Sequence, residues 1–239
     1  VRRTGGVRVV LCVTSDKCYA PKSPPAIYRE GDPLGGVDPY SASKGCAEIV
    51  IESFRSSYFS ADDGGVALAS ARAGNVIGGG DWSPHRLVPD VMRALLEKSP
   101  ILIRNPGGVR PWQHVLEPLA GYLALAERLW EQGGDYSEAW NFGPAPESCR
   151  PVSYIVDRLA AGWGGNAGWI RDTAATWHED DLLRIDATKA WQRLGWRTRL
   201  SLDETLEWIV GWYKAFGNGR DMRYVTMEQI REFQDRSLP

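Results

Sequence analysis

The sequence is poor in the residues that mark metal-binding, secreted and membrane proteins. It has four cysteines without CxxC spacing and three histidines among 239 residues. No apolar run is long enough to cross a bilayer, and the first eight residues lack the apolar stretch of a signal peptide. These absences argue against a metal site, a disulfide framework and a membrane protein. We therefore expect a cytoplasmic protein with reduced thiols.

A surplus of one charge is also missing. Lysine and arginine number 28 against 30 aspartates and glutamates, for a net charge of -2. Without a basic surplus, we expect neither nucleic acid nor a membrane surface as a partner. The 43% hydrophobic and 24% charged content are those of an ordinary globular protein that can bury a core.

A third absence concerns nucleotide binding. No GxGxxG or GxxGxxG follows an N-terminal strand, although this fingerprint holds the pyrophosphate in Rossmann folds. The glycines of Gly78–Asp81 have the spacing of neither this fingerprint nor a Walker motif. We interpret them as a flexible turn that covers a substrate.

Alternating strand and helix patterns predict an α/β fold. Short apolar runs predict strands at 7–14, 66–73, 101–104, 140–144 and 167–172. Helical periodicity predicts helices at 40–58, 87–96, 116–132, 152–163, 186–195 and 202–216. In the first of these helices, Ile49, Val50 and Phe54 should be buried, and Glu48 and Glu52 should face water. The tail, 217–239, should be partly helical or loosely held.

The expected fold class is the C-terminal part of a doubly wound Rossmann-type parallel sheet plus a smaller substrate-binding α/β subdomain. The sequence starts on a strand, whereas a doubly wound sheet needs earlier βα units, so we expect those units to be missing. The predicted divisions are a catalytic part at 1–78, a substrate-binding insert at 79–110, a return to the catalytic part at 111–145, a substrate-binding subdomain at 146–216 and a tail at 217–239.

Tyr40 and Lys44 are the first candidates for chemistry. On a helix they stand at i and i+4, so their side chains face the same way. An ammonium beside a phenol favours the phenolate and lowers the tyrosine pKa, which makes a usable base near neutral pH. A YxxxK pair alone is weak evidence, because many such pairs are only surface neighbours.

Support comes from the polar run Thr14–Lys17, which follows the first apolar strand directly. Ligands of open parallel sheets bind beyond the carboxyl ends of the strands. Serine and aspartate also favour turns, so turn formation is the alternative interpretation.

In order along the chain, these motifs resemble the extended short-chain dehydrogenase/reductase family. Within it, the sequence is similar to the CDP-glucose 4,6-dehydratases. The resemblance covers Val9 to Phe216. It rests on the segments TSDKCY at 14–19, DPLGG at 32–36, DPYSASK at 38–44, GGGDW at 78–82 and RPWQHV at 110–115. The Asp16-Lys17 pair favours this branch, because the related dTDP-glucose enzymes resemble it but carry Asp-Glu there.

The resemblance implies an internally redox-neutral reaction with NAD as cofactor. Tyr40 would take the proton of the sugar 4-hydroxyl as C4 gives its hydride to NAD, and Ser15 would hydrogen-bond that hydroxyl. Lys44 would hold the nicotinamide ribose, with Thr14 also near the cofactor. Asp16 would then protonate the leaving 6-hydroxyl while Lys17 removes the C5 proton. The hydride returns to C6, giving CDP-4-keto-6-deoxyglucose for deoxysugar biosynthesis.

The same resemblance implies substrate contacts and a homodimer in the full-length protein. Arg72 is expected to be structural. Arg110 is the best phosphate clamp, because guanidinium binds diphosphate oxygens in a bidentate way. The substrate-binding candidates are Asn75, Arg110, His114, Asn141 and Arg184, with His178 as a looser one.

Three interpretations stay open on the sequence. We favour a truncated CDP-glucose dehydratase that lacks its main cofactor cradle. The second is a binding module or inactive remnant that holds a sugar nucleotide without redox chemistry. The third is a nucleotide-sugar 4-epimerase, against which Asp16 and Lys17 argue, since epimerisation needs no C5/C6 elimination.

Overall fold

The chain forms two compact units, each assembled from three separate stretches. Unit 1 comprises Val1–Gly74, Pro118–Gly143 and Leu183–Arg197, and unit 2 comprises Asn75–Glu117, Pro144–Leu182 and Thr198–Pro239. The computed structural model describes residues 1, 3–22, 27–59, 65–164, 168–173 and 184–236. The predicted divisions fell after residues 78, 110, 145 and 216, so they differ from these boundaries. The assignment of functions to parts of the chain stays a prediction.

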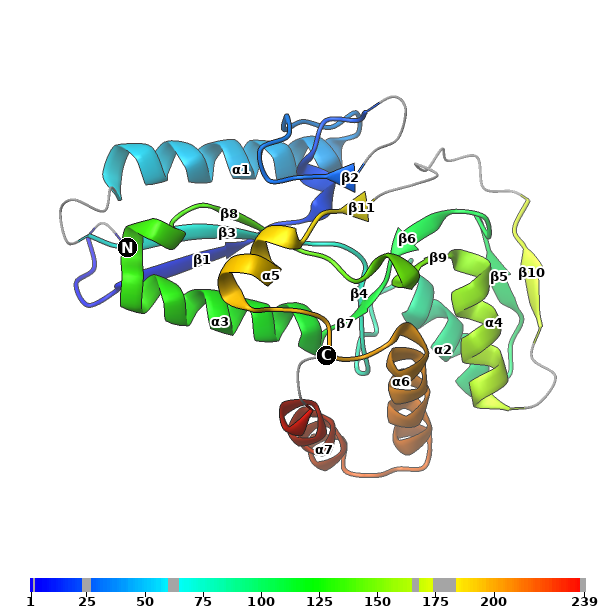
Figure 1. Ribbon diagram of the computed structural model, residues 1–239. Coiled ribbons are helices and arrows are strands. Elements are labelled where there is room, and N and C mark those ends of the chain that lie inside the picture. The colour runs from blue at the N-terminus through cyan, green and yellow to red at the C-terminus, as the bar shows by residue number, and fades with distance from the viewer. Residues whose placement is uncertain (2, 23–26, 60–64, 165–167, 174–183, 237–239) are drawn as a thin grey trace. The chain divides into compact units, whose positions relative to one another are not determined.

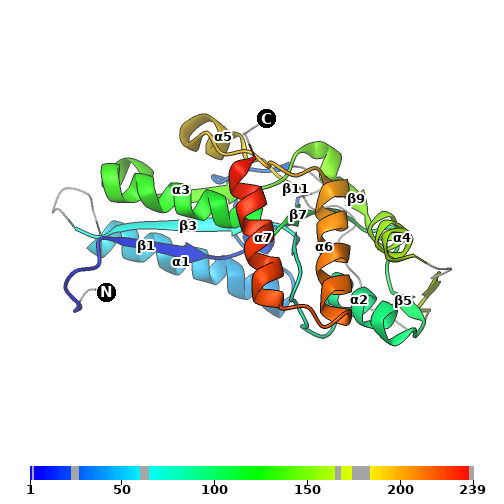
Figure 2. The ribbon, with the colours of Figure 1, turned by 90° about the horizontal axis from the view of Figure 1, so that it is seen from below.

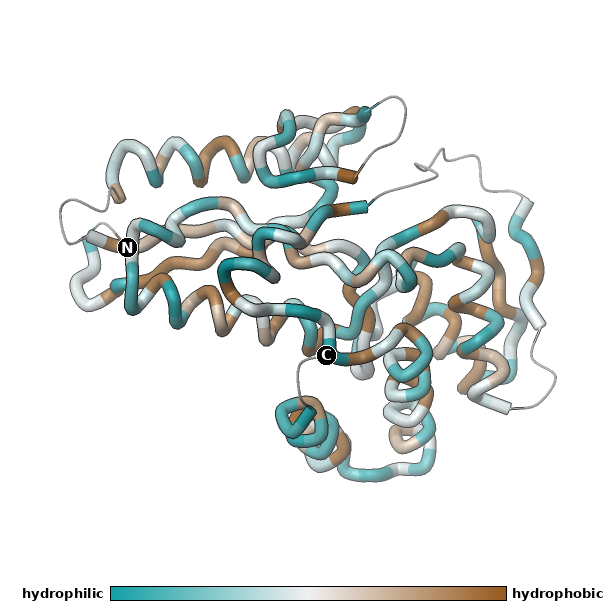
Figure 3. The backbone as a smooth tube through the Cα atoms, in the orientation of Figure 1, coloured by the Kyte–Doolittle hydropathy of each residue, from teal (hydrophilic) through white to brown (hydrophobic). Residues whose placement is uncertain are grey.

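A three-stranded parallel sheet forms the centre of unit 1. Its order is β1 (Val9–Val13), β3 (Ala67–Ala73) and β8 (Ala139–Phe142), which confirms the predicted parallel α/β fold class. Helix α1 (Pro39–Tyr58) covers one face of the sheet and α3 (Leu116–Gln132) the other (Figure 1). Strand β1 is hydrophobic throughout (Figure 3), as expected between two helical layers. Strands β3 and β8 are mostly apolar but carry the buried polar residues Ser70, Arg72 and Asn141.

The core of unit 1 lies between the sheet, α3 and the short helix α5 (Thr188–Leu194). Leu125, Leu129, Trp140 and Trp196 form it, and all four are buried. A separate parallel ladder joins β2 (Ile27–Tyr28) to β11 (Arg184–Ile185). The remaining short elements of unit 1 are the 3-10 helices η1 (Asp16–Cys18) and η3 (Gly133–Tyr136).

Unit 2 is built on helices α2 (Leu87–Glu97), α4 (Val152–Trp163) and α6 (Leu202–Gly217). Their apolar faces meet in a core that includes Met92, Ile155, Leu159, Ile209 and Tyr213. Unit 2 also contains three two-stranded ladders: β4 (Val76–Ile77) with β7 (Gln113–His114), β5 (Ile101–Ile103) with β10 (Trp169–Arg171), and β6 (Val109–Pro111) with β9 (Cys149–Pro151). The 3-10 helix η4 (Pro146–Ser148) directly precedes β9.

The C-terminal tail contains a helix. Helix α7 (Met222–Asp235) runs beside α6 (Figure 2), and it buries Val225 and Phe233. Most of its surface is polar, which explains why its apolar pattern is sparse (Figure 3). The partly helical tail is therefore confirmed, and its two apolar anchors hold it in unit 2.

The prediction for the faces of α1 is wrong for Ile49, Val50, Phe54 and Glu48, and it is confirmed only for Glu52, which is exposed. Ile49, Val50 and Phe54 are 55%, 54% and 44% exposed, while Glu48 is only 3% exposed. The buried positions of the helix are Ser41, Gly45 and Glu48. The helix turns a small and polar face inward because Glu48 finds a buried arginine on β3, a pairing that an apolar periodicity cannot detect.

Candidate functional site

Tyr40 and Lys44 lie in the first two turns of α1. The Asp38 carboxylate caps this helix by accepting the backbone N–H groups of Tyr40 and Ser41 at 2.9 and 3.1 Å. Lys44 Nζ lies 5.5 Å from the centroid of the Tyr40 ring, and the ring is 49% exposed. The two side chains therefore share one side of the helix, with the phenol accessible to a ligand.

The polar segment that follows β1 is held in a defined conformation. Thr14 extends the sheet by donating its N–H to Ala71 O at 2.9 Å. Ser15 Oγ accepts the Lys17 N–H and donates to Asp16 Oδ1, both at 3.2 Å. Ser15 and Asp16 are buried, and Lys17 is half-buried. Three candidate residues thus lie together at the carboxyl end of β1.

Two glycines allow α1 to pack against η1 and the following loop. A Cβ on Gly45 would lie 3.0 Å from Gly35 N and 3.3 Å from Cys18 O, and one on Gly36 would lie 2.4 Å from Ala42 N. A side chain at Gly36 would collide with the backbone of α1, and one at Gly45 would fit only if the neighbouring backbone moved apart. Close backbone packing therefore brings the Tyr40 end of the helix against the Asp16–Cys18 segment.

A buried carboxylate joins α1 to both neighbouring strands. Glu48 accepts hydrogen bonds from Thr14 Oγ1, from Ser70 Oγ at 2.7 Å and from Arg72 Nη2 at 2.7 Å. Burial alone would raise the pKa of Glu48, but the hydrogen bond and charge of Arg72, together with the hydrogen bonds from Thr14 and Ser70, hold that pKa below its usual value. The structure confirms the structural role predicted for Arg72.

This arrangement bears on the predicted cofactor contact of Thr14. Its hydroxyl hydrogen is directed at Glu48, so toward a ligand this hydroxyl can only accept a hydrogen bond. Thr14 therefore anchors the segment that carries the three candidate residues Ser15, Asp16 and Lys17.

Asn141, predicted to touch the substrate, is engaged within unit 1. It is fully buried on β8, where its Oδ1 accepts the Tyr19 hydroxyl at 2.6 Å. Its Nδ2 donates to Tyr28 O and Asp186 O, both at 3.2 Å. With both ends of the amide used internally, we assign Asn141 a positioning role in place of direct substrate contact.

Arg184 lies on β11 in unit 1, where it pairs in register with Ile27. It is partly buried, and its Nε has no hydrogen-bond partner among the described residues. A guanidinium with an unused buried donor suits an anionic or carbonyl ligand. His178 falls outside the described residues.

The other substrate candidates, Asn75, Arg110 and His114, belong to unit 2. The Asn75 carbonyl accepts the Gln113 N–H at 3.2 Å, and Arg110 is buried with Nη1 donating to Val109 O at 2.9 Å.

His114 Nδ1 accepts the Leu116 N–H at 3.3 Å. Burial lowers the pKa of His114 to about 4, so its imidazole is neutral at pH 7. Because it is only 2% exposed, its observed role is to fix the start of α3.

The glycine turn Gly78–Trp82 is not the flexible segment that we expected. A Cβ on Gly79 would lie 2.2 Å from the Trp212 ring, so the turn packs directly on this tryptophan. The Tyr213 hydroxyl donates to Asp81 O at 2.5 Å. The turn is fixed to α6, and its glycines are needed for close approach to an aromatic ring.

Glu117 is a buried ionisable residue of unit 2 that was not predicted from the sequence. Its Oε1 accepts the backbone N–H groups of Arg199 and Leu200 at 2.9 and 2.7 Å. Burial raises its pKa to about 7, although these hydrogen bonds oppose the shift. The sequence feature that could have revealed Glu117 is its position in the first turn of α3, directly before Pro118, because acidic residues are favoured at the start of a helix.

The raised pKa of Glu117 predicts a pH-dependent stability. Its pKa is about 7 when folded and 4.5 when unfolded, so the folded state holds the proton more tightly between these values. The free energy of unfolding should fall as pH rises through that window, by roughly 1.4 kcal/mol per pH unit. Glu117→Gln keeps the accepting oxygen and cannot ionise, so its stability should change less over that window. Urea unfolding at pH 5, 6 and 7 tests this, and parallel profiles for the two proteins would contradict it.

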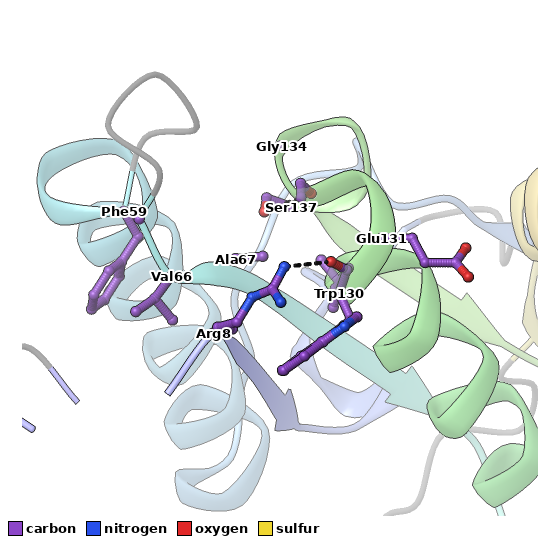
Figure 4. A pocket seen from close by; sticks show the side chains of 11 residues that line it. Arg8, Phe59, Val66, Ala67, Trp130, Glu131, Gly134 and Ser137 are labelled. Carbon is purple, nitrogen blue, oxygen red and sulfur yellow. Dashed lines mark hydrogen bonds between the residues drawn. The ribbon is translucent and has the colours of Figure 1, made fainter. Parts of the chain in front are cut away.

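A pocket of about 240 Å³ lies at the opposite end of the unit 1 sheet (Figure 4). The Arg8 guanidinium lies 3.8 Å from the Trp130 ring centroid and donates to Trp130 O at 3.1 Å. Phe59 and Val66 line another side. The length of α1 separates this pocket from Tyr40 by about 28 Å, so it contains none of the predicted site residues.

Among the described residues, no group of three or more histidine, cysteine, aspartate or glutamate side chains could hold a metal ion. Within the same part of the chain, no helix is both long and apolar enough to span a membrane.

The parallel sheet, with polar residues after β1 and a Tyr-Lys pair on the following helix, defines a Rossmann-type α/β protein. The chain belongs to the NAD dependent epimerase/dehydratase family, whose model matches residues 1–143. This confirms the predicted family, and NAD is the cofactor for which that family is named.

Individual relatives agree with this assignment. The chain is 47% identical to the CDP-glucose 4,6-dehydratase of Salmonella typhimurium over 236 residues, which are 98% of this chain and 66% of that protein. The fold matches the dTDP-glucose 4,6-dehydratase of Bacillus anthracis in complex with NAD, with a TM-score of 0.69 and 19% identity over 90% of this chain and 64% of that one. It also matches the UDP-glucuronic acid 4-epimerase of Bacillus cereus in complex with UDP-glucuronic acid and NAD, with a TM-score of 0.75 and 17% identity over the same shares. The chain thus spans less than two thirds of the length of each of these three proteins.

Proposed function

We propose that the protein carrying this chain converts CDP-glucose to CDP-4-keto-6-deoxyglucose. The observation that carries this proposal is Lys17, directly after the buried Asp16 and in the segment that packs against the Tyr40 helix. A dehydratase needs an acid and a base for the C5/C6 elimination in addition to the Tyr-Lys pair. The 47% identity to a CDP-glucose 4,6-dehydratase supports the same substrate.

Each residue near β1 would have its own task. Tyr40 removes the proton of the 4-hydroxyl, and the Lys44 ammonium favours the phenolate that does so. The Ser15 hydroxyl, which can rotate away from Asp16, aligns the 4-hydroxyl. Lys17 takes the C5 proton, and Asp16 supplies a proton to the departing 6-hydroxyl, so one water leaves. Arg184 is our candidate for contacting the nucleotide.

The residues present fit one end of an NAD molecule. Lys44 and Tyr40 are accessible on one side of α1, where an ammonium and a phenol can hold ribose hydroxyls. When bound, NAD supplies the acceptor and later the donor of one hydride, which leaves C4 and returns to C6. We further propose that the protein acts as a homodimer, because α1 exposes the apolar side chains of Ile49, Val50 and Phe54. We also propose that it is cytoplasmic.

The direct test uses the full-length protein with CDP-glucose. We expect a product with the alkaline absorbance of a 4-keto-6-deoxy sugar, and no net consumption of NAD. CDP-galactose as the only product would show an epimerase. Binding of CDP-glucose without turnover would show a non-catalytic sugar-nucleotide protein.

A further inference from the structure

A continuous set of buried hydrogen bonds runs through unit 1. It starts where Thr14 and Ser70 donate to Glu48, and Arg72 Nη2 binds the same carboxylate at 2.7 Å. Arg72 Nη1 then donates to the Tyr19 hydroxyl at 2.9 Å. The Tyr19 hydroxyl donates in turn to Asn141 Oδ1 at 2.6 Å.

The two ends of this network reach different parts of the candidate site. At one end, Glu48 is on the helix of Tyr40 and Lys44, one turn after the lysine. At the other end, Asn141 Nδ2 binds the carbonyls of Tyr28 and Asp186, which lie on and directly after the paired strands β2 and β11. Strand β11 carries Arg184.

The Tyr19 hydroxyl links the two ends directly through side chains. Glu30 adds a second connection, because its carbonyl accepts Arg72 Nη1 at 3.1 Å and its carboxylate accepts the Asn141 N–H at 3.0 Å. The ring is 4% exposed, so water cannot replace the hydroxyl without rearrangement. Within the network this one oxygen both accepts from Arg72 and donates to Asn141, and among the described residues Asn141 Oδ1 accepts no other hydrogen bond. Buried networks of this kind are rigid when fully satisfied, and removing one member leaves its partners unpaired.

We propose that Tyr19 is a positioning residue that fixes the Arg184 strand relative to the Tyr40–Lys44 helix. This inference rests on the proposed function, because it assigns the strand to nucleotide binding and the helix to catalysis. Two separable effects follow. Cutting the network at Tyr19 weakens nucleotide binding, whereas loosening it at the Glu48 end slows catalysis.

The chain provides a matched control for the cut at Tyr19. Tyr28 stacks on Tyr19 with ring centroids 5.0 Å apart, and it is also buried. Its hydroxyl accepts the Lys22 N–H at 3.0 Å and is outside the network. Tyr19→Phe and Tyr28→Phe therefore each remove one hydroxyl from neighbouring rings, but only Tyr19→Phe removes a member of the network.

The test measures the Kd for CDP by calorimetry and the steady-state constants for CDP-glucose, all with the full-length protein. Tyr19→Phe removes two buried hydrogen bonds and should raise the Kd and KM about tenfold, whereas Tyr28→Phe should stay within twofold of wild type. Equal Kd values for the two variants would overturn the inference, even if Tyr19→Phe melts at a lower temperature.

A second variant keeps the inference testable if Tyr19→Phe does not fold. Ser70→Ala removes one donor to Glu48 from a fully buried site on β3. It should lower kcat about threefold and leave the Kd for CDP unchanged, because it acts only at the helix end. A raised Kd with normal kcat would overturn the inference.

If the wild type binds CDP but does not turn over CDP-glucose, the proposed function fails, while the Kd comparison still decides the role of Tyr19.

Discussion

Tyr40→Phe should abolish most of the activity of the full-length protein while leaving substrate binding intact. The phenol is the only group we assign to the 4-hydroxyl proton, and general-base catalysis contributes about 10²–10⁴-fold to rates. Since kcat depends on this transfer and binding does not, kcat should fall by a factor in that range. The Kd for CDP-glucose should stay within about threefold, because one hydroxyl among many polar contacts is removed.

The matched control is Tyr58→Phe, at the other end of the same helix. Tyr58 is exposed and lies about 27 Å along α1 from Tyr40, so its hydroxyl cannot reach the same substrate. This variant should retain wild-type kcat. A loss of less than tenfold in Tyr40→Phe would remove Tyr40 from the role of base.

The largest expected effect on stability is that of Glu48→Ala. It leaves the Arg72 guanidinium, 3% exposed, without its carboxylate partner. Breaking a buried ion pair by removing one partner costs about 3–5 kcal/mol, because an uncompensated charge stays in the interior. Urea unfolding, followed by a signal assigned to unit 1, measures this loss.

Glu52→Ala provides the comparison on the same helix. Glu52 pairs with Arg55, but its side chain is 60% exposed, and such pairs contribute about 0–1 kcal/mol. The double variant Glu48→Leu with Arg72→Met should recover part of the stability lost in Glu48→Ala, because it removes both charges together. If Glu48→Ala were no more destabilised than Glu52→Ala, the buried pair would not hold α1 to the sheet.

The sequence was sufficient where function depends on local spacing. Tyr40 and Lys44 are one helical turn apart, and the Thr14–Lys17 run follows a strand, so both could be placed from periodicity alone. Helices α2, α4 and α6 of unit 2 were predicted almost to the residue, as Val152–Trp163 shows. The resemblance then supplied the chemistry that spacing could not.

The sequence was insufficient where a residue depends on a distant partner. Glu48 was predicted to lie on the solvent-exposed face of its helix, because its partner Arg72 on β3 is 24 residues away in the sequence. Gly79 was read as flexible because nothing near it in the chain indicates Trp212. The environment of Asn141 is likewise set by Tyr19 and Asp186, which only the folded chain brings together.

The interleaving of the two units has a consequence for how the protein is made. A ribosome completes most of the unit 1 sheet early, but Asp186, Ala190 and Trp196 emerge only after most of unit 2. Until then Asn141 lacks one of its acceptors, and the core around Trp140 lacks two of its buried members. Unit 1 therefore cannot mature on the nascent chain until its last stretch has emerged. Because each unit is assembled from three separate stretches, a single cut in the gene cannot yield either unit intact.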